Sequence, residues 1–193
     1  MLRIIAGKYR SRILEQPPLS ITRPTIDRAR EALFNIIQNN IENSVVLDCF
    51  AGSGAFCFEA VSRGATKAIA IEKNPIAFAI IQKNLEKLNI NNMEVKNMDS
   101  LNYLEHAKNI QFDFIYLDPP YKDTASYLSG SFNHNEFYDW CIEKAKQGYK
   151  VFISEYDMPS DRFKSVFSVA KRQNLHHLGA GAIKQEHLFM PIV

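Results

Sequence analysis

The chain has 193 residues, of which 46% are hydrophobic and 23% charged, and its formal net charge is +2. This length and composition are typical of one globular domain with a sizeable core. The longest uninterrupted apolar run is Ile76–Ile81, far below the roughly 20 residues of a membrane-spanning helix. The charged N-terminus also lacks the apolar stretch of a secretory signal. We therefore expect a cytoplasmic protein without a membrane span, whose cysteines Cys49, Cys57 and Cys141 are buried thiols rather than disulfides.

Positive charge is concentrated at the start of the chain. Residues 1–30 hold seven basic and two acidic residues, a sum of +5, so the remaining residues sum to −3. This asymmetry is typical of a basic extension that binds a polyanion, and a solvated basic terminus without a partner is the alternative. The residues expected to hold phosphates are Arg3, Lys8, Arg10, Arg12, Arg23, Arg28 and Arg30.

Apolar periodicity predicts helices and strands that alternate along the chain. A first helix, capped by Thr25, has an apolar face of Ala29, Ala32, Leu33, Ile36 and Ile37. The predicted strands are 45–47, 68–71, 93–96, 112–117 and 149–154, followed by a pair near 167–175 and 182–190 that is hinged at 179–181. Further helices are predicted from Gly54 to Arg63, from Pro75 to Leu88 with Asn74 as the cap, and over 136–146.

This alternation predicts an α/β fold with a mostly parallel sheet and helices on both faces. In such sheets, ligands bind beyond the carboxyl ends of the strands. Acidic residues fall at four of these ends: Asp48, Glu72, Asp99 and Asp118. Each alone is an ordinary solvated residue where a strand leaves the core, but the four together indicate a ligand site.

The turn after the first of these strands indicates the class of ligand. A dinucleotide fingerprint G-x-G-x-x-G would use Gly52, Gly54 and position 57, where this chain has cysteine. The carboxylate of Asp48 would repel a pyrophosphate over this loop and attract an ammonium or sulfonium group. S-adenosylmethionine (SAM) carries both cations and no phosphate, so SAM is the expected cofactor.

Two further strand ends fit the same cofactor. Glu72 lies where an acid can accept both ribose hydroxyls, a role that SAM and NAD sites share. Asp99 can accept the exocyclic amine of adenine, and Asn97 or Met98 can contact the ring. No metal site is expected, because His176 and His177 have no carboxylate or cysteine at ligand spacing nearby.

These motifs resemble a known family. Residues 48–54, DCFAGSG, with Glu72 and the DPPY tetrapeptide at 118–121, are similar to class I SAM-dependent methyltransferases that modify exocyclic amino groups. The N-terminal RIIAGKY at 3–9 and TRPT at 22–25, with DR at 27–28 and REALFN at 30–35, resemble RsmD-type 16S ribosomal RNA guanine-N2 methyltransferases. The resemblance covers residues 1 to about 155.

The resemblance implies a Rossmann-like class I methyltransferase with a mostly parallel seven-stranded sheet and a short N-terminal basic β extension. It implies an RNA-binding extension at 1–24 and a methyltransferase domain at 25–193. It also implies N2 of one guanine in 16S ribosomal RNA as the target, within a small-subunit particle, and a monomeric enzyme. The expected cofactor-binding residues are Asp48, Phe50, Ala51, Gly52, Ser53, Gly54, Glu72, Lys73, Asn97, Met98 and Asp99.

The tetrapeptide Asp118, Pro119, Pro120 and Tyr121 is the expected catalytic set. An exocyclic nitrogen is a poor nucleophile, because its lone pair is delocalised into the ring. If the Asp118 carboxylate and the Pro119 carbonyl each accept one N–H, the lone pair turns toward the methyl donor. Prolines stiffen the turn and add no competing donor, and Tyr121 can stack on a base that has left its helix.

Two other functions remain open. Asp-Pro-Pro-Tyr serves adenine as well as guanine, so an adenine-N6 DNA methyltransferase is the nearer alternative. The chain leaves no room for a separate target-recognition region, and the basic extension favours RNA held by phosphate contacts. An NAD-dependent oxidoreductase on a similar sheet is the more distant alternative, and Asp48 and Cys57 speak against it.

Overall fold

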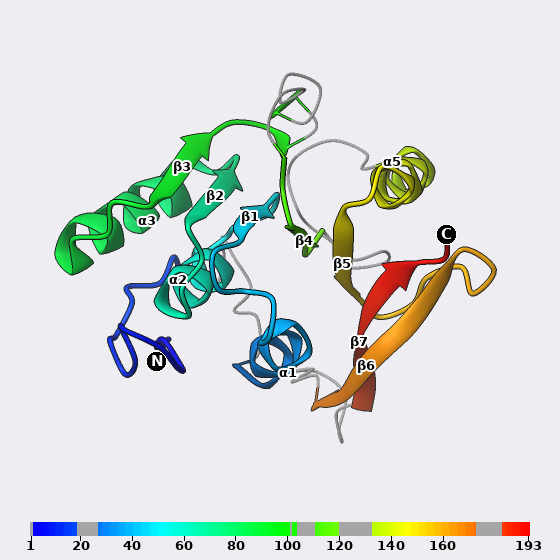
Figure 1. The fold of residues 1–193 in the computed structure, drawn as a ribbon, viewed down its shortest axis with the longest axis horizontal. Helices are drawn as coiled ribbons and strands as arrows, with labels where there is room; N and C mark the ends of the chain where they lie inside the picture. The colour runs from blue at the N-terminus through cyan, green and yellow to red at the C-terminus, as the bar shows by residue number, and fades with distance from the viewer. Residues whose placement is uncertain (1, 19–26, 101, 104–110, 120–132, 173–182) are drawn as a thin grey trace. The chain divides into compact units, whose positions relative to one another are not determined.

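The computed structural model describes residues 2–18, 27–100, 102–103, 111–119, 133–172 and 183–193 (Figure 1). At 27–29, 171–172 and 183–184 only the backbone is described. The chain forms two compact units, Met1–Leu117 and Asp118–Val193. The predicted boundary at residue 24 lies outside the described residues.

The first unit is built on four parallel strands. They are β1 (Val45–Asp48), β2 (Lys67–Glu72), β3 (Met93–Asn97) and β4 (Phe114–Leu117), and they lie in the order β3-β2-β1-β4. Each pair of neighbours is parallel, so all four strands end at the same edge of the sheet. The predicted strands are confirmed here, although β4 begins two residues later than expected.

The first unit also contains the helices α1 (Asp27–Ile37), α2 (Ala55–Ser62) and α3 (Pro75–Leu88). The Asn74 side chain accepts hydrogen bonds from the backbone N–H groups of Ile76 and Ala77, so the predicted cap of α3 is confirmed. Every residue of α2 is buried. In Figure 1, α2 lies between the strands and the N-terminal segment of the chain.

The buried face of α1 differs from the prediction. Ile36 is 44% exposed, whereas Arg30, Leu33, Phe34 and Ile37 are at most 3% exposed. These four residues follow the i, i+3, i+4, i+7 spacing of one helix face. The Phe34 ring stacks on Phe56 of α2 at 5.2 Å, and this contact turns the helix so that Ile36 faces outward. The cap Thr25 lies outside the described residues.

The N-terminal segment folds back on itself as a short hairpin over residues 2–14. The Ile4 N–H donates to the Arg12 carbonyl at 3.0 Å, and the Leu14 N–H donates to the Leu2 carbonyl at 3.0 Å. Leu2, Ile4 and Leu14 are buried, whereas Ile13 is exposed. This hairpin, called the basic hairpin below, lies within the predicted extension of residues 1–24.

The second unit contains α5 (His134–Lys146), β5 (Lys150–Glu155), β6 (Phe163–Arg172) and β7 (Ile183–Pro191). The strands have the order β5-β7-β6, with both neighbouring pairs antiparallel, and α5 packs on β5 and β7. Helix α5 begins two residues earlier than predicted because the Asn133 side chain caps it. β6 begins four residues earlier than predicted, and the hinge at 179–181 lies outside the described residues.

The cysteines agree with the prediction, since Cys49, Cys57 and Cys141 are buried free thiols. Burial raises the pKa of the Cys57 thiol, and the charge of Asp48 adds to this effect. Among the described helices, none has the length and apolar composition needed to cross a bilayer.

Candidate active site

Two of the four strand-end acids are the last residues of their strands. Asp48 ends β1 and Glu72 ends β2, and in the sheet Asp48 pairs with Ala70 while Glu72 pairs with Asn97. Asp99 follows two residues after the end of β3. Because β1, β2 and β3 are parallel, these acids share one edge of the sheet, as the sequence predicted.

Asp48 lies below the loop that follows β1. It is only 2% exposed, and its Oδ1 accepts a hydrogen bond from the Phe50 N–H at 3.2 Å. The carboxylate therefore supports the loop from inside the protein, rather than standing exposed above it. The loop 48–54 itself contains no basic residue.

Several N–H groups of this loop donate hydrogen bonds to acceptors within the protein. The Gly52 N–H donates to Glu72 Oε2 at 2.7 Å, the Ala51 N–H to the Ile71 carbonyl at 3.0 Å, and the Gly54 N–H to the Ala51 carbonyl at 2.6 Å. A dinucleotide loop instead points its N–H groups at the pyrophosphate. In this loop the N–H groups of Phe50, Ala51, Gly52 and Gly54 already have protein acceptors, which disfavours a phosphate ligand.

Both glycines of the loop adopt left-handed backbone conformations, with φ of 53° at Gly52 and 75° at Gly54. An added Cβ at Gly54 would lie 3.1 Å from the Phe58 ring and 3.2 Å from the Ile81 side chain of α3. The left-handed conformation favours glycine at position 54, and a Cβ there would also be crowded by side chains of α2 and α3. The loop shape thus has a structural cause that the sequence motif alone does not show.

Glu72 connects the loop to the end of β2. Its Oε1 accepts the Asn74 N–H at 2.7 Å, while its Oε2 accepts the Gly52 N–H at 2.7 Å. Burial raises the pKa of this carboxyl above the ordinary value for glutamate, and the N–H groups of Asn74 and Gly52 oppose that rise. The side chain is only partly buried, so a carboxylate held in a fixed orientation reaches the surface beside the loop.

Three of the other expected cofactor residues contact one another or the backbone. Lys73 Nζ pairs with Asp99 Oδ2 at 3.1 Å, with side-chain exposures of 61% and 35%. The Asn97 amide donates to the backbone carbonyls of Glu72 and Lys73 at 2.8 and 3.0 Å. Asn97 therefore fixes the end of β2, and Met98 and Asp99 are the half-buried residues next to it.

Sequence reasoning missed one residue at this edge. The Ser100 hydroxyl, which is buried, donates to the Cys49 carbonyl and so ties the segment after β3 to the end of β1. A serine shortly after a strand carries no motif, and only the parallel arrangement of the strands brings it to Cys49. Asn74 also has a role here that the sequence did not indicate. It was predicted only as the cap of a helix, but its N–H also donates to the Glu72 carboxylate.

The predicted catalytic tetrapeptide is described in part. Asp118 follows Leu117, the last residue of β4, and is half-buried, whereas Pro119 is buried. Pro120 and Tyr121 lie outside the described residues. β4 itself ends at the same sheet edge as β1, since Tyr116 pairs with Asp48.

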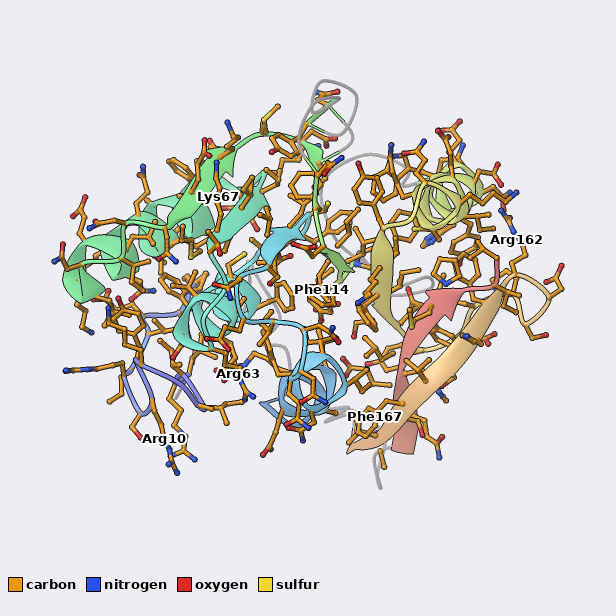
Figure 2. All side chains as sticks on the ribbon, viewed as in Figure 1. Arg10, Arg63, Lys67, Phe114, Arg162 and Phe167 are labelled. Atoms are coloured by element: carbon orange, nitrogen blue, oxygen red, sulfur yellow. The ribbon has the colours of Figure 1, made fainter. Side chains whose placement is uncertain are left out.

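The predicted phosphate-binding residues divide into two groups. Arg3, Lys8, Arg10 and Arg12 are exposed on the basic hairpin, and Figure 2 labels Arg10 there. Arg30 is 3% exposed and donates through Nη2 to the Arg3 carbonyl at 2.8 Å, so it holds the hairpin instead of facing solvent. Arg23 and the side chain of Arg28 lie outside the described residues.

The residues that the structure describes include no cluster of metal-ligating side chains.

Comparison with known proteins gives one family match and several relatives. The family model described as "Conserved hypothetical protein 95" matches residues 2–135. "Ribosomal RNA small subunit methyltransferase D" of Buchnera aphidicola (subsp. Acyrthosiphon pisum) is 38% identical over 61% of this chain and 62% of its own length. The protein of the same name from Escherichia coli K12 is 37% identical over 75% of this chain and 71% of its own length.

A solved structure extends the likeness to nearly the whole chain. The Escherichia coli protein yhhF is 27% identical, with a TM-score of 0.69, and the match covers 98% of this chain and 97% of that one. The predicted fold, a Rossmann-like class I methyltransferase with a mostly parallel seven-stranded sheet, is confirmed by this likeness. The alignment with the Buchnera relative spans less than two thirds of that relative's length.

Proposed function

Since this chain belongs to the Conserved hypothetical protein 95 family, we propose that it is a SAM-dependent methyltransferase acting on N2 of one guanine in 16S ribosomal RNA. The names of its relatives support the substrate class. The observation that carries the cofactor assignment is the loop of residues 48–54, whose N–H groups at Phe50, Ala51, Gly52 and Gly54 are donated to protein acceptors.

The residues around this loop fit SAM better than a dinucleotide. Glu72 holds a carboxylate in place to accept the ribose hydroxyls, and buried Asp48 supplies negative charge under the loop. Met98 and Asp99 are proposed to contact the adenine, with Lys73 positioning Asp99 through their ion pair. When bound, SAM supplies an activated methyl group on a sulfonium. The chain's own residues then need only position the target nitrogen and accept the one proton that it loses when the methyl group is transferred.

Asp118 and Pro119 are proposed to activate the target nitrogen. A carboxylate and a carbonyl that each accept one N–H of the guanine amine draw the nitrogen toward a tetrahedral shape and aim its lone pair. Support comes from their position, because they follow β4 directly and β4 ends at the sheet edge that carries Asp48. Tyr121 would stack on the extruded base, which recovers about 1–3 kcal/mol of the cost of unstacking.

The substrate is proposed to be RNA inside a small-subunit particle, acted on by a monomeric enzyme in the cytoplasm. Residues 1–24 would be the RNA-binding extension of a methyltransferase domain at 25–193. The exposed cations of the basic hairpin support this assignment, since phosphate contacts provide affinity without sequence preference.

The decisive experiment measures transfer of labelled methyl from SAM to unmodified small subunits, naked 16S RNA and duplex DNA in parallel, with nucleoside analysis of each product. We expect N2-methylguanosine in RNA, and the comparison of particle with naked RNA identifies the substrate form. N6-methyladenine in DNA would keep the cofactor and reject the RNA assignment. Stabilisation by NAD but not by SAM would reject the methyltransferase.

The pH dependence of SAM binding tests the role of Glu72. Protonation replaces an acceptor oxygen by a donor, so SAM binds the ionised form. Burial raises the pKa of Glu72, so its carboxyl takes up a proton at a higher pH than an ordinary glutamate does. As the pH falls from 7 through that pKa, SAM affinity is expected to drop by up to about tenfold per pH unit. Calorimetric titration should show this drop in the wild type and a flatter profile in Glu72→Gln. Equal slopes in both proteins would remove Glu72 from the ribose site.

The salt dependence of RNA binding tests the basic hairpin. Replacing Lys8, Arg10 and Arg12 together by glutamine is expected to weaken RNA binding uniformly across RNA sequences. The slope of log affinity against log salt should fall by about 2, since each phosphate contact on single-stranded RNA contributes about 0.7. Replacing Lys67, Lys146 and Lys164, which are exposed lysines outside the hairpin, is the matched control. An unchanged slope in the hairpin variant would argue against phosphate contacts there.

A further inference from the structure

One buried carboxylate is unexplained by the proposed cofactor and target sites. Glu59 of α2 is 0% exposed, and its two oxygens accept the N–H groups of Ile5 and Ala6 at 2.7 and 3.0 Å. Arg63 Nε donates to the same carboxylate at 2.7 Å, and the Arg63 guanidinium lies 5.0 Å from the centre of the Phe34 ring. Figure 2 labels Arg63 in the region between α1 and α2. A buried charge is tolerated when its oxygens are paired in this way.

A second group on α2 holds the next residues of the hairpin. Ser62 Oγ accepts the Tyr9 N–H at 2.9 Å and donates to the Ala6 carbonyl at 2.5 Å, while the Ser62 carbonyl accepts the Lys8 N–H at 2.7 Å. Gly7 has φ of +80°, and an added Cβ there would lie 1.8 Å from the Ser62 carbonyl oxygen. The backbone of residues 5–9 is thus bonded to one turn of α2.

The geometry points to Glu59 and Ser62 as positioning residues that hold the basic hairpin in the orientation needed to bind RNA phosphates. This inference rests on the proposed function. Helix α2 begins directly after the loop at Gly52 and Gly54 and ends at Ser62, so one short helix carries the cofactor loop at its start and the hairpin at its end. The exposed cation Lys8 lies within the bonded segment, and Arg10 follows directly after it in the chain.

The hairpin is held on its other sides as well, which sets the size of the expected effect. Arg30 of α1 donates to the Arg3 carbonyl, and Asn84 of α3 exchanges two hydrogen bonds with the Glu15 backbone at 2.9 and 3.0 Å. Loss of Glu59 should therefore loosen the orientation of residues 5–9 without releasing the whole segment. RNA then binds only the correctly oriented fraction, so its affinity falls by that fraction while SAM affinity does not.

The test compares RNA and SAM binding in Glu59→Gln. The glutamine side chain places its NH2 group opposite the N–H of either Ile5 or Ala6, so one of these two hydrogen bonds is lost. It also lacks the negative charge that pairs with Arg63. We expect the Kd for naked 16S RNA, measured by filter binding, to rise about tenfold, with the SAM Kd within about twofold of wild type. Glu86→Gln, an exposed glutamate of α3, is the matched control and should change neither.

A positioning role is separated from a general structural role by non-additivity. In the background of Arg3→Gln, Lys8→Gln, Arg10→Gln and Arg12→Gln, Glu59→Gln should cause no further loss of RNA affinity, because the exposed cations of the basic hairpin are gone. Ser62→Ala, in α2, and Gly7→Ala, in the hairpin, should also raise the Kd for RNA without changing the Kd for SAM. If Glu59→Gln does not fold, these two variants provide the test. The inference would be overturned if Glu59→Gln lowered RNA affinity by the same factor in that background as in the wild type, or if a variant lost SAM and RNA affinity equally. Wild-type RNA affinity in all three of Glu59→Gln, Ser62→Ala and Gly7→Ala would also overturn it. Failure of the wild-type protein to bind or methylate RNA would instead reject the proposed function.

Discussion

Asp118→Ala is expected to lower the rate of methyl transfer by about 10²–10⁴-fold, the range for removal of a group that handles the reacting proton, while SAM affinity stays at the wild-type level. The physical reason is that the exocyclic nitrogen has no free lone pair until acceptors draw it out of conjugation. Asp118 is half-buried directly after β4, outside the loop that is proposed to hold SAM. Single-turnover transfer to 16S RNA, together with calorimetric SAM binding, measures both quantities on one preparation.

The matched control lies at the other end of the same strand. Asp113 is exposed, and its Oδ2 accepts the Val45 N–H at 2.8 Å before β4 begins. Asp113→Ala should leave the transfer rate unchanged and lower the free energy of unfolding by about 0.5–1.5 kcal/mol, the worth of one hydrogen bond. Asp118→Asn, which keeps one carbonyl acceptor, should fall between wild type and Asp118→Ala. A wild-type rate in Asp118→Ala would show that the proposed activation is wrong.

Glu72→Ala is expected to weaken SAM binding by about 10–100-fold, because a hydrogen bond to a charged group contributes about 1.5–3 kcal/mol. The same change leaves the Gly52 and Asn74 N–H groups without the carboxylate that fixes them. The loop and the start of α3 lose a shared acceptor, so the free energy of unfolding should also fall by about 1–3 kcal/mol. Calorimetric titration with SAM and chemical unfolding in the absence of SAM separate the two effects.

Glu94→Ala is the control for this change. Glu94 lies on the neighbouring strand β3, and its carboxylate forms exposed ion pairs with Lys67 at 3.3 Å and Lys96 at 2.9 Å. Exposed pairs contribute about 0–1 kcal/mol, so stability and SAM affinity should both stay near wild type. If Glu72→Ala bound SAM as tightly as Glu94→Ala, the ribose assignment would have to be abandoned.

Local patterns account for the parts of the fold that the sequence predicted well. The Asn74-Pro75 pair marks the start of α3 because a cap and a proline at the first helical position act within a few residues. The acids at 48 and 72 were placed at strand ends because short apolar runs stop there and parallel strands end at one edge. The apolar face of α1 was placed less well, because contact of Phe34 with Phe56 of another helix set its rotation.

The amino-acid sequence by itself determined the alternation of strands and helices, the glycine loop, the acids at the strand ends and the basic character of the N-terminal segment. Only the tertiary structure decided which acceptor each loop N–H takes, that Arg30 is buried under the hairpin, and that Glu59 bonds to Ile5, which lies 54 residues away. The physical reason is the range of the interactions. Capping, turn chemistry and periodicity act over one or two turns of chain, whereas these contacts join segments that become neighbours only when the sheet and its helices pack.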